Sequence, residues 1–333
     1  STPSNSSAAS DVYKRQVEKT KALEAYQEAG EDPKALECIP MLKRSDIKRE
    51  AAKIINEELT VDDSLFLYHD VCTNGIGYVD LMFKTDSIAP EQIPYLGLLK
   101  SVLGYVDTEN YTYGELFNEI NANTGGINCG VEVFDRADST EEFQAMFSVR
   151  GKALYTKMDF LFKMIGEILN SSKLEDTKRL YEIVASVKSR AQVNLTGAGH
   201  STAVLRAAAY SSPMAAFQDE MAGIGYYQFI EKLEKDFEQR KEETVEELCK
   251  LMKKILRPEN FMISYTGERE SLETVQKLAG AVKAGLGTEP VEKSEEKLTC
   301  TKKNEGFKTS GQVQYVAQTG NFKNCLLYTS PSP

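Results

Sequence analysis

The chain has 333 residues with an ordinary globular composition, 41% hydrophobic and 27% charged, which excludes collagen-like, low-complexity and disulfide-scaffold proteins. Its formal charge of −10 disfavours a nucleic-acid-binding role, since phosphates attract clustered Lys and Arg. No apolar run reaches the roughly 18–20 residues of a membrane span, and no secretory signal opens the chain. The cysteines are widely spaced without a CxxC pair, which predicts buried free thiols in a reducing compartment. They are Cys38, Cys72, Cys129, Cys249, Cys300 and Cys325.

The two ends of the chain can be encoded by the two complementary strands of one DNA sequence. Ser10 to Gln16 can be encoded by TCA GAT GTG TAT AAG AGA CAG, and the opposite strand, shifted by one base, encodes CLLYTS, residues 325–330. Both stretches resemble the transposase adaptors used to prepare sequencing libraries. We therefore predict that residues 1–16 and 325–333 are adaptor scars outside the fold. The natural segment, 17–324, is then one charge more negative than the whole chain, and we expect it to be a fragment of a longer protein.

Residues 17–60 are predicted to form a helical hairpin that acts as a linker. Residues 17–29 favour a helix that ends at Gly30, a common residue after a helix C-terminus. After Asp32-Pro33, an apolar stripe of Ile47, Ala51, Ile54 and Ile55 predicts a second helix.

The pattern then changes to that of strands. Residues 64–73 and 76–84 flank Asn74-Gly75, a dipeptide typical of tight turns, so they are predicted to pair as a hairpin. Val79, Leu81 and Phe83 alternate with Tyr78, Asp80 and Met82, which places one face against a core. A mostly buried helix follows at 90–104, and Thr112 with Glu115 forms a capping box. Residues 127–134 and 142–151 are two more predicted strands.

The remaining sequence is chiefly helical. Stripes with helical spacing predict one helix from Met158 to Leu169, a second from Leu180 to Ala191 and a third from Tyr226 to Phe237. Thr244 and Glu247 are predicted to cap a fourth helix. Residues 261–267 are a predicted strand, 271–287 a last helix, 288–297 a charged linker and 313–320 the start of another strand. The fold class is therefore α+β, with few strands, long helices and a sheet covered on one face.

Residue types alone indicate no catalytic site. His69 and His200 are far apart, and neither belongs to an HExxH or HxxEH pair, so both are interpreted as structural or surface residues. GAGHST, residues 197–202, lacks the third glycine of a dinucleotide loop and follows a predicted helix. We interpret it as a break between helices, with Ser201 or Thr202 as a cap. The acidic stretch 234–247 has alternating charges typical of a solvated helix face.

Several segments, taken in order, resemble one family. They are PMLKRSDIKREA, TNGIGYVDLMFKTDSI, IPYLGLLKSVLGYVDTENYTYGELFNEINANTGGI, GHSTAVLRAAA and GIGYYQFIEKLE. Together they are similar to the presequence-protease branch of the pitrilysin, or insulinase-like, zinc metallopeptidases. This resemblance implies four homologous α+β repeats, in two halves joined by a helical hairpin, that close around a peptide. It assigns 17–60 to the end of the hairpin, 61–287 to the third repeat with a mixed, largely antiparallel sheet, and 288–324 to the start of the fourth repeat.

The zinc motif of that family is HxxEH in the first repeat. On the corresponding helix of this chain, Tyr95, Leu98 and Leu99 stand where His, Glu and His would be. Apolar side chains neither bind zinc nor move a proton, so the resemblance implies no catalytic, metal-binding or cofactor-binding residue here. Zinc is expected in a missing N-terminal half.

Two hypotheses follow from the resemblance. In the first, the chain is the non-catalytic C-terminal part of a zinc metalloendopeptidase that degrades short unfolded peptides, with the N-terminal catalytic half and those peptides as its partners. In the second, it is a non-enzymatic structural or partner subunit. The hairpin favours the first, because it joins two halves in one chain. The negative charge fits basic peptides or an ordinary acidic surface, and bacterial cytoplasm or an organelle matrix is the expected location, without nucleic-acid or membrane partners.

Overall fold

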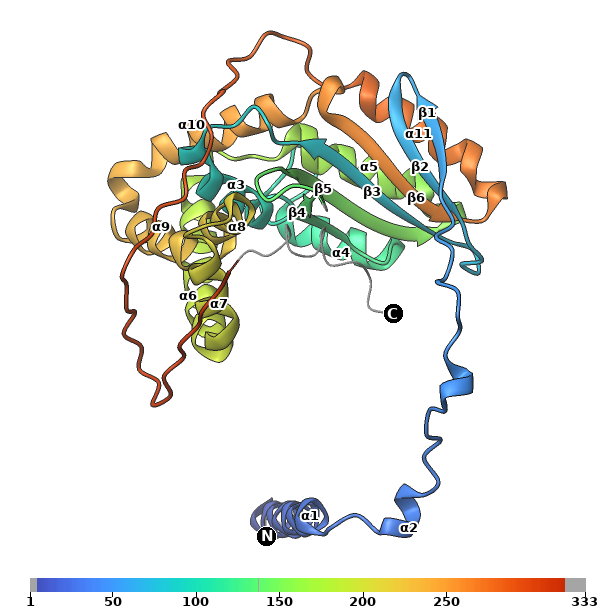
Figure 1. Cartoon of the computed structure of the whole chain (residues 1–333), viewed down its shortest axis with the longest axis vertical. Helices are drawn as coiled ribbons and strands as arrows, with labels where there is room; N and C mark the ends of the chain where they lie inside the picture. Colours follow the sequence, from blue (N-terminus) through green and yellow to red (C-terminus); the bar gives the residue numbers. More distant parts are fainter. Residues whose placement is uncertain (1–4, 137, 321–333) are drawn as a thin grey trace. The chain divides into compact units, whose positions relative to one another are not determined.

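Six strands form the one sheet of the part of the chain that is described here. A computed structural model describes residues 5–136 and 138–320. The strands are β1 (Glu57–Val61), β2 (Ser64–Asp70), β3 (Ile76–Lys84), β4 (Ile127–Asp135), β5 (Phe143–Leu154) and β6 (Phe261–Gly267). The sheet is mixed and largely antiparallel, with β2 and β6 as the parallel pair. The α+β fold class is confirmed (Figure 1).

The chain divides into two units, one that ends at Ile54 and one that begins at Ile55. The first contains helix α1 (Asn5–Glu28) and the short helix α2 (Pro33–Leu36), which Asp32 caps. The prediction of a second helix in the hairpin at 17–60 is wrong. Residues 47–56 have no regular structure after a single 3₁₀ turn, and Ile47 and Ile54 are 69% and 89% exposed. An apolar stripe stabilises a helix only when another element covers it, and nothing described covers this one.

Helix α1 starts at Asn5, inside the segment attributed to an adaptor. That attribution depends on codons and stays a prediction. The matching segment 325–333 lies outside the described residues.

The strand order corrects the predicted hairpin. In the order β1-β2-β6-β3-β5-β4, β6 lies between β2 and β3, so the two strands beside Asn74-Gly75 do not pair. The turn itself forms, with φ of 53° at Asn74 and 83° at Gly75. It is held by Glu268, just after β6, whose carboxylate accepts hydrogen bonds from the backbone N–H groups of Thr73, Asn74 and Gly75. A distant carboxylate thus replaces the cross-strand bonds of a hairpin.

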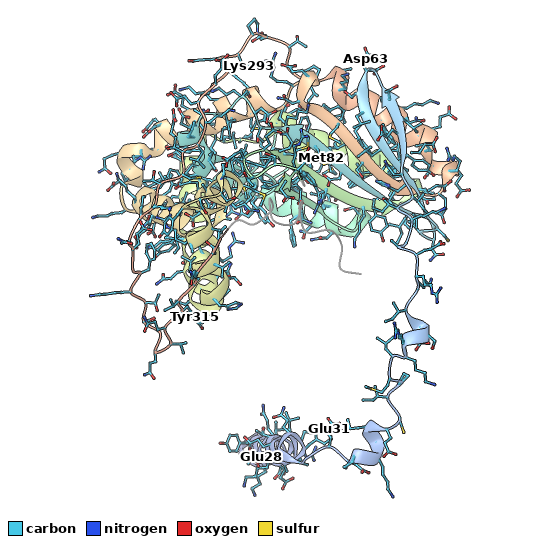
Figure 2. The ribbon with its side chains drawn as sticks, viewed as in Figure 1. Glu28, Glu31, Asp63, Met82, Lys293 and Tyr315 are labelled. Atoms are coloured by element: carbon cyan, nitrogen blue, oxygen red, sulfur yellow. The ribbon has the colours of Figure 1, made fainter. Side chains whose placement is uncertain are left out.

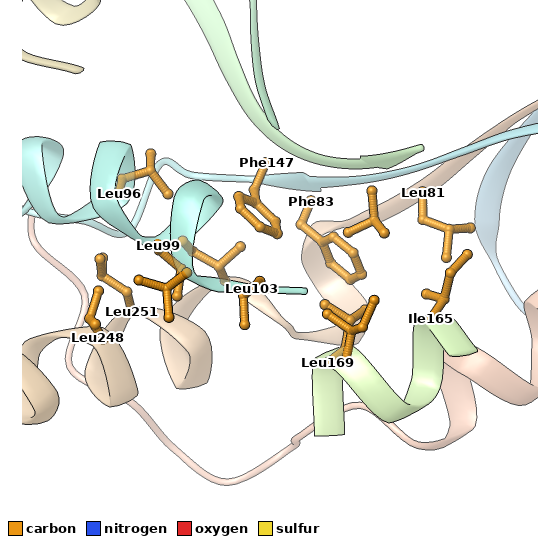
Figure 3. Close-up of a cluster of buried hydrophobic side chains, with 14 of the residues drawn as sticks. Leu81, Phe83, Leu96, Leu99, Leu103, Phe147, Ile165, Leu169, Leu248 and Leu251 are labelled. Carbon is orange, nitrogen blue, oxygen red and sulfur yellow. The ribbon is translucent and has the colours of Figure 1, made fainter. Parts of the chain in front are cut away.

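The core lies between one face of this sheet and the helices α3 (Ile93–Val102), α5 (Met158–Ser171) and α11 (Leu272–Ala284). Val79, Leu81 and Phe83 point into it, as predicted, with at most 3% of each side chain exposed. Leu96, Leu99 and Leu103 approach the sheet phenylalanines Phe83 and Phe147 from α3 and the residue after it (Figure 3). Met82, predicted on the opposite face, is also buried, although it does not belong to this core (Figure 2).

Five helices of the described chain build a layer beside the sheet, and α4 (Tyr113–Asn123) packs on α5. The five are α6 (Thr177–Gly197), α7 (Gly199–Ala208), α8 (Pro213–Ala222), α9 (Ile224–Lys235) and α10 (Phe237–Ile255). The Thr112–Glu115 capping box on α4 is confirmed. GAGHST breaks the helix between α6 and α7 as predicted, but Ser201 and Thr202 lie inside α7 and cap nothing. The Thr244 cap is wrong too, because Thr244 is a buried interior residue of α10 whose hydroxyl donates to the carbonyl of Arg240.

After α11 the chain continues as an extended segment, residues 285–320, along the helical layer (Figure 1). Lys293 and Tyr315 mark two points on it (Figure 2). The predicted strand at 313–320 is wrong, since these residues pair with no strand in the described part of the chain and Val316 is 86% exposed. A strand requires a hydrogen-bonded neighbour, and the described elements along this path are helices.

One ion-pair cluster attaches the extended segment to the helices. The guanidinium of Arg206 on α7 donates to both carboxylate oxygens of Glu305, at 2.8 and 2.9 Å, and also to Asp219 on α8. Tyr210 donates a further bond to Glu305. These bonds hold the pKa of Glu305 down at about 2. We call Arg206, Asp219 and Glu305 the anchor cluster.

Candidate functional site

The helix that resembles the family's zinc helix is α3, and its three marker positions are packed in protein. Tyr95, Leu98 and Leu99 are 6%, 0% and 1% exposed. The Tyr95 hydroxyl accepts a hydrogen bond from Arg240 at 2.9 Å, and its ring meets Phe229 edge-on. All three residues are buried, and Tyr95 stabilises the contact of α3 with α9 and α10. They do not fit a metal ion.

The two histidines lie on separate elements with separate partners. His69, on β2 as predicted, places Nδ1 2.7 Å from the carbonyl oxygen of Ile55 and Nε2 3.2 Å from the Ser264 hydroxyl. His200 lies in the first turn of α7 beside the Tyr315 ring. Across residues 5–136 and 138–320, no group of three or more His, Cys, Asp or Glu side chains is arranged to hold a metal ion.

The cysteines differ from their prediction in burial. Five are free thiols, while Cys325 lies outside the described residues. Cys38 and Cys72, which lie shortly after α2 and β2, are exposed, so the prediction of buried thiols is wrong for these two. Cys129, Cys249 and Cys300 are half-buried. Burial raises the pKa of the Cys129 thiol to about 12, which makes it a poor nucleophile at neutral pH.

A polar row crosses the sheet on the face opposite the core. The strand register places Ser264 of β6, Asp80 of β3, Arg150 of β5 and Asn128 of β4 directly side by side. Arg150 donates to Asp80 at 2.8 Å, and the Ser148 hydroxyl donates to the same carboxylate at 2.7 Å. We call these four aligned residues the polar row.

The polar row lines a shallow hollow of about 300 Å³, together with Tyr78, Lys152 and Thr266 of the neighbouring row. Sequence reasoning identified Asp80 only as an outward-facing residue and missed the row. Its members become neighbours through pairing between strands up to 184 positions apart, as Asp80 and Ser264 show. The side chains offer donors and acceptors but no activated nucleophile, so this face can bind polar groups and shows no machinery for bond cleavage.

A larger cavity, of about 580 Å³, lies beside β4, the last strand of the sheet. The C-terminal end of α3, helix α4 and residue Arg190 of α6 contribute to its walls. Sequence reasoning named none of its polar residues as a site, because they come from separate elements and form no motif.

Fold and candidate site together define an α+β domain in which Tyr95, Leu98 and Leu99 of α3 are buried. The chain belongs to the family described as Peptidase M16 (subfamily C) associated, which it matches over residues 5–233. This confirms the family resemblance. None of the helices in the described part of the chain has the length and apolar content of a membrane span.

The chain is also similar in sequence to named proteins. The chain is 35% identical over 307 residues to Protein HypA of Clostridium perfringens, covering 92% of this chain and 31% of that protein. It is 27% identical over 306 residues to Presequence protease 1, chloroplastic/mitochondrial, of Arabidopsis thaliana, covering 91% and 28%. It is 29% identical over 210 residues to the mitochondrial presequence protease of Yarrowia lipolytica, covering 63% and 21%. The chain thus spans about a third or less of the length of these relatives.

Proposed function

We propose that this chain is the non-catalytic C-terminal part of a zinc metalloendopeptidase that degrades short unfolded peptides. The observation that carries the proposal is that the chain belongs to a peptidase-associated family while Tyr95, Leu98 and Leu99, the residues at the zinc-motif positions, are buried apolar or aromatic side chains. A domain of this kind contributes to the enclosure of the substrate and leaves the chemistry to another part of the protein.

In this proposal residues 61–287 are the third of four repeats, 17–60 the end of the linker and 288–324 the start of the fourth repeat. Within residues 288–324, the anchor cluster holds Glu305 against Arg206 of α7, which keeps this segment beside the helices of the third repeat. Zinc and its ligands belong to the N-terminal half of the same polypeptide, which is the partner of this chain. Relatives named chloroplastic or mitochondrial support an organelle matrix or the bacterial equivalent as the location.

The polar row is the surface that we assign to the wall of the peptide chamber. An unfolded peptide presents backbone N–H and C=O groups that need partners once water is removed. The row offers the carboxylate of Asp80, the guanidinium of Arg150 and the amide of Asn128 on one face, with Arg150 still 53% exposed. Bulk water must be excluded from the chamber for efficient hydrolysis, and a wall of this kind contributes to that exclusion.

The test is to join the chain to the N-terminal half encoded upstream and to measure hydrolysis of short unfolded peptides. We expect an HxxEH motif in that half, and activity that a chelator removes. The matched control replaces the glutamate of that motif with glutamine, which should abolish hydrolysis and leave the association of the halves intact. The proposal is wrong if the upstream frame holds no such motif, or if the joined halves are folded, associated and inert.

A further inference from the structure

The cavity beside β4 has an unusual balance of charge. Its walls contain two cationic side chains, Lys100 from α3 and Arg190 from α6, along with apolar side chains from α4, α5 and the residue after α3. The carboxylate on the wall, Glu132, is joined to Arg150 at 3.1 Å. No hydrogen bond or ion pair joins Lys100 or Arg190 to another side chain in the part of the protein that the structure describes. The cavity therefore has donors that lack an acceptor.

Lys100 is the more constrained of the two cations. It lies in the last turn of α3 and is half-buried, and this burial lowers the pKa of its ammonium group. The helix C-terminus stabilises a nearby positive charge to a small extent, which accounts for a lysine here. This effect does not supply an anion, so the partly desolvated ammonium group of Lys100 has no negatively charged partner among the described residues.

A second, independent observation lies behind the same wall. Tyr226 on α9 is 5% exposed, and its hydroxyl is the one buried side-chain polar atom in the described residues without a well-formed hydrogen bond. The ring packs on Gly97 of α3, where a β-carbon would lie 2.8 Å from a ring carbon. One helical turn further along α3, Ser101 lies on the wall of the cavity.

Tyr226 itself does not line the cavity, and its ring lies on the α3 residue one turn before Ser101, which does. Burial raises the pKa of Tyr226, and the Ser101 hydroxyl and the Arg190 guanidinium both act in the opposite direction. Ser101 and Arg190 both line the cavity. A buried hydroxyl without a partner costs free energy unless an acceptor reaches it.

We propose that this cavity binds the C-terminal carboxylate of a short peptide, with Lys100, Arg190 and the Tyr226 hydroxyl as donors. A carboxylate has two acceptor oxygens. It complements the ammonium and guanidinium groups, which can only donate, and the tyrosine hydroxyl, which can donate one bond. The apolar wall, which includes Leu103, Phe117, Ile120 and Ile168, can receive the last side chain of the peptide. The choice of a peptide as the source of the carboxylate rests on the proposed function.

The experiment uses the whole chain and two matched ligands, N-acetyl-leucyl-leucine and its C-terminal amide, with binding followed by NMR titration. We expect the acid to bind at least about tenfold more tightly than the amide, because the amide lacks the charged acceptor. Inorganic phosphate is the third ligand and should compete only weakly. Equal affinity for acid and amide, or tighter binding of phosphate than of the acid, would overturn the proposal.

Two variants and two controls locate the site. Tyr226→Phe and Lys100→Met should each weaken binding of the acid about tenfold and leave the melting temperature unchanged or higher, since each removes a poorly satisfied buried group. Tyr227→Phe removes a hydroxyl that donates to Glu231, and Lys163→Met removes an exposed lysine of α5; both should leave binding unchanged. A loss of stability in Tyr226→Phe without a loss of affinity would show that the hydroxyl is structural and would contradict the assignment.

The outcome is separable from that of the proposed function. Inert joined halves would disprove the peptidase, while unaltered binding by the variants of the isolated chain would disprove the carboxylate site.

Discussion

Asp219 is the most buried charged residue in the described part of the chain, at 1% exposure. Besides Arg206, its carboxylate accepts hydrogen bonds from the backbone N–H groups of Ile224 and Gly225 at the start of α9, at 3.1 and 3.2 Å. It therefore joins α7 to α8 and also caps α9. Neither role was visible in the sequence, where Asp219 belongs to an unremarkable stretch between two predicted helices.

Asp219→Ala should destabilise the second unit by about 3 kcal/mol, because it leaves Arg206 with one partner fewer and two buried N–H groups without an acceptor. Urea denaturation measures the change. Glu273→Ala, which breaks an exposed pair with Lys277 on α11, is the control and should stay within about 0.5 kcal/mol of the parent chain. Equal effects of the two substitutions would contradict the role given to Asp219.

Glu305 gives the anchor cluster a pH dependence. Its pKa is lowered from 4.5 to about 2 by the bonds from Arg206 and Tyr210, so the folded state favours the ionised form. The stability that this group contributes is complete above pH 4.5 and is lost as the pH falls from 4.5 to about 2.

We therefore expect the extended segment to detach from α7 over that acidic range, before the sheet unfolds. Limited proteolysis at a series of pH values, with an acid-active protease, detects the released segment. Glu305→Gln should show the same susceptibility already at about pH 7. Detachment of the parent segment at about pH 6, or its persistence in the variant, would argue against this carboxylate as the attachment point.

At the scale of elements, α3 depends on a glycine for its close approach to its neighbours. A β-carbon on Gly97 would collide with the carbonyl oxygen of Met221 at the end of α8 and with the Tyr226 ring on α9. The small residue lets α3 pack tightly against α8 and α9.

Gly97→Ala should cost about 1–3 kcal/mol of stability, since the clash involves backbone as well as a side chain. Gly166→Ala on α5 is the matched control, because the nearest atom to its β-carbon would be 3.8 Å away. That substitution should be neutral or stabilise by up to about 1 kcal/mol through helix propensity. Thermal and urea denaturation of both variants provide the comparison, and a stable Gly97→Ala protein would show that α3 has room to move.

Elements with strong local patterns could be predicted from the sequence. The bounds of β3 and β6 agree with the prediction because alternation and flanking turn residues mark both ends. The hairpin prediction failed because strand pairing is a non-local property: Glu268, 194 residues away, closes the turn at Asn74. The cap at Thr244 failed because a threonine can satisfy its hydroxyl within a helix by bonding the carbonyl four residues earlier.

The same contrast applies to the candidate site. The expectation that α3 carries no zinc motif needs no knowledge of packing, because it depends on the identity of three residues on one helix, and it stays a prediction. The polar row and the cavity beside β4 could not be predicted, because each is assembled by register or packing from elements far apart in the sequence.

At the scale of the whole molecule, the ends of the chain provide a test of the adaptor interpretation. Deletion of residues 1–16 and 325–333 should leave the thermal unfolding of the second unit nearly unchanged. Residues 11–16 are largely exposed, so their removal uncovers little apolar area. A loss of several kcal/mol on deletion would show that these segments belong to the fold.

Metal content is the second test at this scale. The purified chain should hold no stoichiometric zinc, because α3 offers no ligands and the two histidines lie on separate elements. Elemental analysis after dialysis measures this. One tightly bound zinc per chain that disappears in a His69→Ala or His200→Ala variant would refute the proposal that this repeat is non-catalytic.

Because β6 lies between β2 and β3, the sheet can form completely only after β6 has been synthesised on the ribosome. β2 and β3 emerge early, yet the strand that joins them is translated after β4, β5 and the whole helical layer. Until residue 267 has left the exit tunnel, both strands present backbone edges without a partner. The nascent chain therefore carries these unpaired strand edges while residues 85–260 are made, and exposed edges of this kind can pair with other chains.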